Sequence, residues 1–162
     1  MSTRHLAVLA LLLAPSIPRP TGACSPLPEN DGSHVVDPAF AGDAVAPSAV
    51  TATFSVIHPS NEGSRGCAPI DCGPGVPHID LDVVATDDRA PTDRMGYQLT
   101  VLGGEPPAGL SLPSGPVLTA YGDLLLRFAA DAGGFNFALE VRAVDLNGNV
   151  GPPSTITISD PG

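Results

Sequence analysis

The sequence predicts an all-β fold, a single sandwich of about seven antiparallel strands that follows a signal peptide and a flexible tether. Apolar and polar side chains alternate in several short runs, which is the period of a strand with one buried face. The 162 residues include 19 prolines and 18 glycines, which favour many turns over long helices. No run has a convincing helical period, so we expect no helix in the domain.

The last hairpin, residues 135–158, carries the strongest pattern. Alternate residues of 135–143 form an entirely apolar face, and residues 155–158 repeat the alternation with Ile156 and Ile158 inward. Between the two runs, Asn147-Gly148-Asn149 is typical of a hairpin turn. A two-stranded hairpin is marginally stable alone, so its apolar face predicts a second layer.

Four more runs, residues 50–56, 78–87, 96–102 and 122–129, are predicted strands that supply this layer. Gly103-Gly104 is expected to end the third run. Short extended pieces near Leu110, Leu112 and Leu118 bring the count to about seven strands. The inward side chains are expected to be those of Val50, Ala52, Phe54, Val56, Ile79, Leu81, Val83, Ala85, Tyr97, Leu99, Val101, Leu124, Leu126 and Phe128.

Residues 1–23 are typical of a signal peptide. A short polar start precedes the apolar run 6–14, which is too short to cross a bilayer, and Thr21-Gly22-Ala23 forms a small-residue cleavage site. With Cys24, this site resembles the lipobox of bacterial lipoproteins, which implies that Cys24 is acylated and becomes the N-terminus. Ordinary cleavage before Cys24, which would give a secreted protein, is the alternative. Residues 24–46 are rich in Pro, Gly, Ser and Asp, and we expect a flexible tether.

Residues 59–77 form a long loop that contains Cys67 and Cys72. An exported chain meets oxidising conditions, so a Cys67–Cys72 disulfide is expected. That pairing leaves Cys24 over, in agreement with its lipidation. The alternative is a zinc site, because His58, Cys67, Cys72 and His78 are the ligand types of a Cys2His2 complement.

Three segments resemble a known class of domain. Residues 97–99, residues 107–112 and above all residues 141–149 (VRAVDLNGN) look like immunoglobulin-like and fibronectin type III-like domains of exported bacterial proteins. The resemblance covers residues 47–160 and implies an immunoglobulin-like β-sandwich. The chain departs from the fibronectin type III pattern because it has no Trp and carries a cysteine pair in its first long loop.

Charge and motifs exclude several functions. Seven basic residues stand against 17 acidic ones, a balance unsuited to nucleic acid, whose phosphates require a basic face. The sequence has no Gly-x-Ser-x-Gly nucleophile motif and no glycine-rich phosphate loop. We therefore expect no catalytic residues and no enzyme.

One set of polar side chains suggests a ligand. In immunoglobulin-like topology the loop after the second strand and the loop before the last strand lie at the same end. Their oxygen-bearing side chains suit calcium, which takes six to eight oxygen ligands. The alternatives are turn chemistry, since Asp and Asn bond to nearby backbone, and neutralisation by Arg89 and Arg94. The candidate calcium residues are Asp87, Asp88, Asp93, Asp145, Asn147 and Asn149.

The sequence favours a non-enzymatic protein of the cell envelope, held to the membrane only by its lipid. Its expected role is structural or adhesive, with a protein or surface glycan contacted through loops or an exposed edge strand. The alternative is a small-ligand or carbohydrate-binding module that could depend on calcium. Such a module would need exposed aromatic rings, and the only tyrosines are Tyr97, expected inward, and Tyr121.

Overall fold

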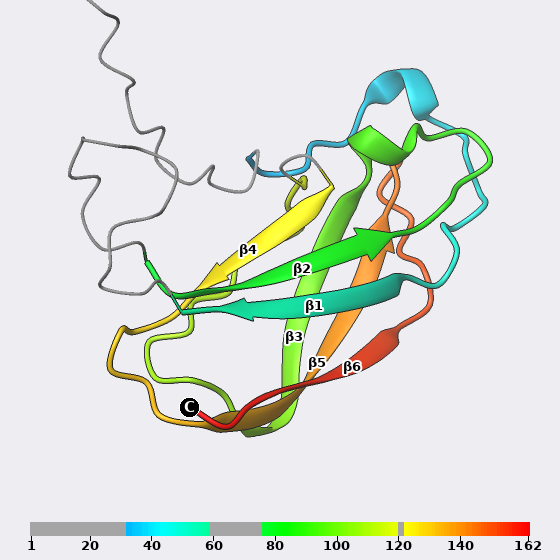
Figure 1. Ribbon diagram of the computed structural model, residues 1–162. Coiled ribbons are helices and arrows are strands. Elements are labelled where there is room, and N and C mark those ends of the chain that lie inside the picture. Colours follow the sequence, from blue (N-terminus) through cyan, green and yellow to red (C-terminus); the bar gives the residue numbers. More distant parts are fainter. Residues whose placement is uncertain (1–31, 59–75, 120–121) are drawn as a thin grey trace, which may run out of the picture.

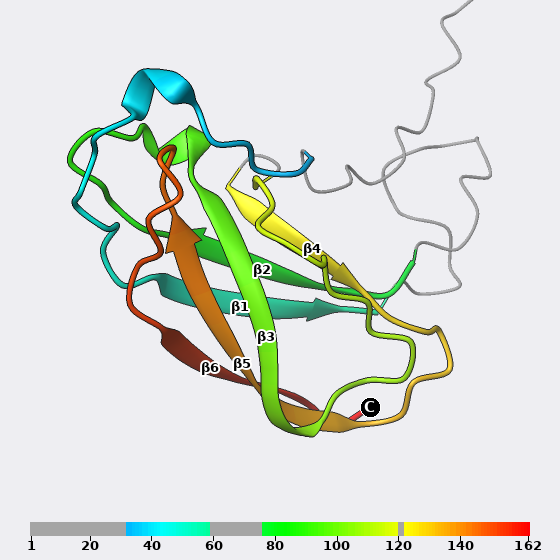
Figure 2. The ribbon, with the colours of Figure 1, turned by 180° about the vertical axis from the view of Figure 1, so that it is seen from behind.

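The computed structural model describes residues 32–58, 76–119 and 122–162, which form two antiparallel three-stranded sheets (Figure 1). One sheet has the order β1-β2-β4 and the other β3-β5-β6. Figure 2 shows the strands of one sheet running across those of the other. The strands are β1 (Thr51–Ile57), β2 (His78–Val84), β3 (Gly96–Glu105), β4 (Asp123–Arg127), β5 (Phe135–Val144) and β6 (Ser154–Asp160).

The predicted all-β sandwich is confirmed, with six strands rather than about seven in the described residues. The segments around Leu110, Leu112 and Leu118 are not strands. Val117 makes only isolated bridges, to Tyr97 at the start of β3 and to Ser33. Leu110 and Leu112 pack against the core, but the prolines around them leave no run of free N–H groups long enough for a ladder.

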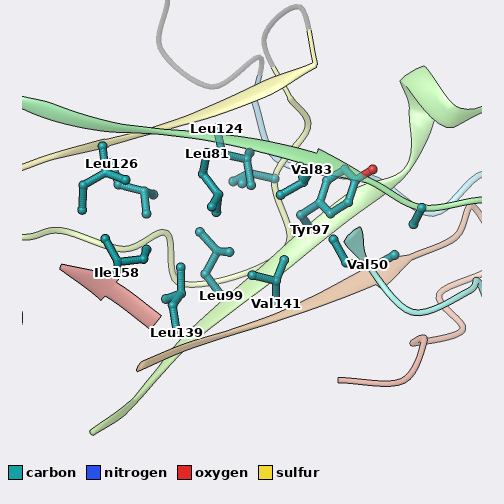
Figure 3. Close-up of a cluster of buried hydrophobic side chains, with 14 of the residues drawn as sticks. Val50, Leu81, Val83, Tyr97, Leu99, Leu124, Leu126, Leu139, Val141 and Ile158 are labelled. Atoms are coloured by element: carbon teal, nitrogen blue, oxygen red, sulfur yellow. The ribbon is translucent and has the colours of Figure 1, made fainter. Parts of the chain in front are cut away.

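The core lies between the two sheets and consists of the inward residues of the alternating runs (Figure 3). Tyr97 and Leu99 of β3 and Val141 of β5 face Leu81 and Val83 of β2 across this core. Alternation explains the match, because every second side chain of a strand points to the same face. Ala52, Phe54 and Val56 of β1 are only half-buried.

β3 is longer than predicted. It continues through Gly103 and Gly104 to Glu105 after a register shift between Val101 and Gly103. Gly104 has φ +91, and a Cβ there would lie 2.5 Å from the backbone oxygen of Asn136. Glycines that usually break a strand here allow a bulge, because only a residue without Cβ fits this conformation and this close approach.

The folded unit also begins earlier than the expected boundary at residue 47. His34 N donates to Pro116 O (2.9 Å) and Asp37 N donates to Leu146 O (2.7 Å), so this part of the expected tether lies on the sandwich. A short 3-10 helix, η1 (Pro38–Phe40), is capped by the preceding Asp37, whose side chain accepts a hydrogen bond from Ala39 N. Proline, aspartate and glycine serve here as caps and turns rather than as a flexible linker.

Phe40 holds the segment in place. Its ring packs against the core, and the guanidinium carbons of Arg89 and Arg94 lie 5.8 and 5.7 Å from the ring centroid. Arg94 belongs to a second 3-10 helix, η2 (Thr92–Arg94), and its Nη2 donates to Asp37 Oδ2 at 2.7 Å. That hydrogen bond holds the pKa of Asp37 below its ordinary value, and Ala39 N adds to the effect. Cation–π contacts of this kind contribute about 0.5–1 kcal/mol each at exposed sites.

Candidate functional site

The N-terminal segment, the β2–β3 loop and the β5–β6 loop meet at one end of the sandwich, which we call the loop end (Figure 1). The prediction that the β2–β3 and β5–β6 loops share an end is confirmed. The six candidate calcium residues do not, however, converge on one point. Asp145, Asn147 and Asn149 form a turn network, Asp87 and Asp88 belong to a carboxylate group, and Asp93 belongs to neither.

Asp145 organises the β5–β6 loop. Its carboxylate is fully buried, and Oδ1 accepts hydrogen bonds from Asn147 N and Asn149 N, both at 2.8 Å. Oδ2 accepts a third from the side-chain amide of Asn149 at 2.7 Å. A buried carboxylate is tolerated when donors surround it in this way. Asp145 therefore serves the turn, as the alternative reading of the sequence held.

The two asparagines of the loop reach across to the N-terminal segment. Asn147 Nδ2 donates to the backbone oxygen of Asp43 at 2.7 Å, and Asn149 Nδ2 donates to the same oxygen at 3.0 Å. The amides are thus used to fix Asp43 in position. Asn147 and Asn149 therefore hold the backbone of Asp43, which belongs to the carboxylate group described next.

The carboxylate group consists of Asp43, Asp87 and Asp88. One oxygen from each lies within 4.8 Å of the oxygens of the other two. Asp43 is buried, Asp87 is half-buried and Asp88 is exposed. Asp93 is exposed on η2 and is not a member of the group.

Two of the three carboxylates are oriented by the backbone next to them. Asp43 Oδ1 accepts from Val45 N at 3.1 Å. Asp87 Oδ1 accepts from Arg89 N at 2.9 Å and from Ala90 N at 2.6 Å. Such turns fix where the second oxygen of each side chain points. The second oxygens, Oδ2 of Asp43 and of Asp87, are buried and have no hydrogen-bond partner among the described residues.

Asp43 is the residue that sequence reasoning missed. It lies in a stretch whose composition resembles a linker, and no strand period marks it. The available signal was Phe40, an aromatic residue in a supposed tether of a chain with only 4% aromatic residues. A large apolar ring in a solvated linker is out of place, and here it marks a segment that folds onto the domain.

His34 lies beside the same network. Burial lowers the pKa of its imidazole, although the charge and the backbone carbonyl of Asp145 act in the opposite direction. Its Nε2 is buried without a partner in the described part of the chain. A Cβ added to Gly96 would lie 2.5 Å from the imidazole Cγ, so the ring covers the start of β3.

The two histidines of the proposed zinc complement have other partners. His58 Nε2 is 2.6 Å from Asp160 Oδ2, and its ring meets Phe128 edge-on. His78 is buried and its Nδ1 is 2.9 Å from Val76 O. Cys24, Cys67 and Cys72 lie outside the described residues, so the lipidation and disulfide predictions stay predictions.

A second candidate surface is the free edge of β1. This strand ends its sheet, and no backbone hydrogen bond is made on that edge by any residue the structure describes. Its sequence, Thr-Ala-Thr-Phe-Ser-Val-Ile, has no charge, proline or glycine. Natural edge strands are usually protected by such residues, by bulges or by short length. The other edges differ: β3 begins under Val117, and β4 and β6 carry charged residues.

No protein-family model matches this chain, and no curated protein or solved structure matches it either. Among the described residues, no helix is long and apolar enough to cross a membrane. The two antiparallel sheets alone establish the β-sandwich architecture. The immunoglobulin-like or fibronectin type III-like subclass remains an expectation from the sequence.

Proposed function

We propose that the protein is a non-enzymatic domain of the cell envelope, exported and anchored by a lipid on Cys24, with a structural or adhesive role. Its partner is a protein that adds a strand to the free edge of β1. The observation that carries this proposal is the seven-residue, uncharged edge of Thr51–Ile57, whose outer backbone groups have no hydrogen-bond partner among the described residues.

The chemistry of this edge suits strand addition. Outward-facing Thr51, Thr53 and Ser55 are exposed, so an incoming strand meets small polar side chains and a row of backbone donors and acceptors. Main-chain hydrogen bonds supply affinity in such pairing, and pockets for alternate side chains supply specificity. The half-buried Phe54 and Val56 lie on the opposite face, where apolar side chains of an added strand would extend the core.

The carbohydrate-binding alternative is less well supported. Tyr97 is buried in the core, and Tyr121 lies outside the described residues. No Phe or Tyr ring within residues 32–58, 76–119 and 122–162 is exposed, so that part of the chain offers no Phe or Tyr platform for a sugar. Binding on a glycan array would favour this alternative over strand addition.

A lysine at the edge tests the proposal. Thr53→Lys places a positive charge on β1, the strand with which the partner's strand would pair. Natural edge strands often carry a lysine, which discourages pairing with another chain. We expect proximity labelling on whole cells to lose the partner proteins that the wild type labels. The lysine itself is tolerable in the fold, because Thr53 is exposed and lies opposite Asp82 on β2.

Thr100→Lys is the matched control. Thr100 is also an exposed strand threonine opposite an acidic residue, Glu140, but it lies on β3. This variant is expected to label the same proteins as the wild type. If Thr53→Lys also labels them at equal surface abundance, β1 is not the docking edge.

A further inference from the structure

The carboxylate group at the loop end has the geometry of a cation site. Asp43 comes from the N-terminal segment, whereas Asp87 and Asp88 follow β2, and one oxygen of each lies within 4.8 Å of the others. Calcium binds oxygens at 2.3–2.6 Å, so two ligands of one ion stand at most about 5 Å apart. The three oxygens can therefore share one ion.

Two buried, unpaired oxygens distinguish this group from an ordinary acidic surface. Asp43 is only 5% exposed, and its Oδ2 has no hydrogen-bond partner among the described residues. Asp87 Oδ2 is likewise buried and unpaired. A buried polar atom without a partner is unfavourable, and a carboxylate oxygen most of all. A cation bound between these side chains would satisfy both oxygens.

The nearby arginines are occupied elsewhere. Arg94 pairs with Asp37, and the guanidinium groups of both Arg89 and Arg94 lie against Phe40. In the part of the chain that the structure describes, no ion pair joins an arginine to Asp43, Asp87 or Asp88. The neutralisation that the sequence suggested as an alternative is absent there, so the negative charge of the group is left for another cation.

We propose that Asp43, Asp87 and Asp88 bind Ca²⁺ and that the ion joins the N-terminal segment to the β2–β3 loop. Three carboxylates are hard oxygen ligands, which favour calcium over softer metals. Water fills the remaining coordination positions. Backbone caps already orient Asp43 and Asp87, and the asparagines of the β5–β6 loop hold the backbone of Asp43. The affinity expected for such a site is that of extracellular modules, about 10⁻⁴–10⁻³ M.

The ion would control whether the N-terminal segment stays docked on the sandwich. Residues 32–46 connect the sandwich to the chain that leads to Cys24, and Asp43 is the ligand in this segment. Calcium would stabilise the docked segment against detachment. Without calcium, repulsion among three carboxylates favours its release.

Thermal unfolding of the full chain in EDTA, then in CaCl2 up to 10 mM, tests the site. At this concentration the melting temperature should rise by about 4–10 °C. NaCl of equal ionic strength should not reproduce the shift. Asp88→Asn should abolish most of the shift, and because Asp88 is exposed this variant should still fold. Asp93→Asn removes the same charge from a neighbouring exposed position outside the group, and it should respond like the wild type.

Two further measurements, calorimetric titration and amide exchange, decide the proposal. Calorimetric titration with CaCl2 should show one site in the wild type and in Asp93→Asn, and at least tenfold weaker binding in Asp88→Asn. Amide exchange at Asp37 and Val45 should slow when calcium is added. No calcium shift in the wild type, or an equal shift in Asp88→Asn, overturns the site. A shift without slower exchange at Asp37 and Val45 overturns the link to the tether.

Discussion

At the scale of single residues, Asp145 combines burial with a full set of donors. Its two oxygens accept hydrogen bonds from Asn147 N, Asn149 N and the side-chain amide of Asn149. The side-chain amides of the same asparagines donate to the backbone oxygen of Asp43. The conformation of the β5–β6 turn therefore helps to position the carboxylate group. Polar networks of this kind are favourable only when every member is satisfied.

Asp145→Ala should therefore lower the free energy of unfolding by about 3 kcal/mol, because two backbone N–H groups and one amide lose their acceptor. Asp145→Asn keeps one carbonyl acceptor and should lose about half as much. Urea unfolding measures both. Asp93→Asn, on the exposed η2, should change stability by no more than about 0.5 kcal/mol. Equal stability of Asp145→Ala and the wild type would mean that the turn does not need this carboxylate.

At the scale of elements, β3 and β5 show how a strand can pass through two glycines. After the register shift, Gly103 pairs with Ala138, Gly104 with Phe137 and Glu105 with Asn136. The bulge lengthens the β3–β5 ladder beyond the predicted end of β3. It also keeps the edge of β3 irregular, which discourages pairing with another chain there.

Gly104→Ala should destabilise the protein by about 2 kcal/mol or more. Its φ of +91 is unfavourable for a residue with a Cβ, which would also lie 2.5 Å from Asn136 O. Gly103→Ala is the control, since nothing lies within 4 Å of a Cβ there and its φ is not positive. The midpoints of urea unfolding should separate the two variants. If both behave alike, the conformation of Gly104 is not a requirement of β3.

At the scale of the whole molecule, the chain has a net charge of −10, and the folded N-terminal segment of the domain reaches at least to Ser33. From Cys24 to Gly32 the chain can extend over at most about 28 Å. A domain lipidated at Cys24 would therefore stay close to the membrane surface. Any partner of β1 would have to approach within that layer.

Anchoring is tested by intact-mass analysis of the membrane fraction. We expect a species that starts at Cys24 and carries diacylglycerol on its sulfur. Cys24→Ser should appear in the soluble fraction, because a hydroxyl cannot form the thioether and each lost methylene removes about 0.8 kcal/mol of membrane affinity. A mature wild-type protein without the diacylglycerol mass would show ordinary secretion instead.

The sequence by itself determined the strands and the residues that face the core, because the alternation of side chains is a local property of the chain. It also placed the β2–β3 and β5–β6 loops at one end through the expected topology. It could not separate Asp145, which serves its own turn, from Asp87 and Asp88, since both kinds of aspartate look alike in a loop.

Only the tertiary structure brought Asp43 to Asp87 and Asp88. No period links the N-terminal segment to the β2–β3 loop, and their contact depends on Phe40, two arginines and two asparagines from distant positions. The carboxylate of Asp43 becomes buried only when the N-terminal segment docks. Its Oδ2 is then shielded from water and has no hydrogen-bond partner among the described residues. Strand formation is set by neighbours in sequence, whereas a shared ion site is set by neighbours in space.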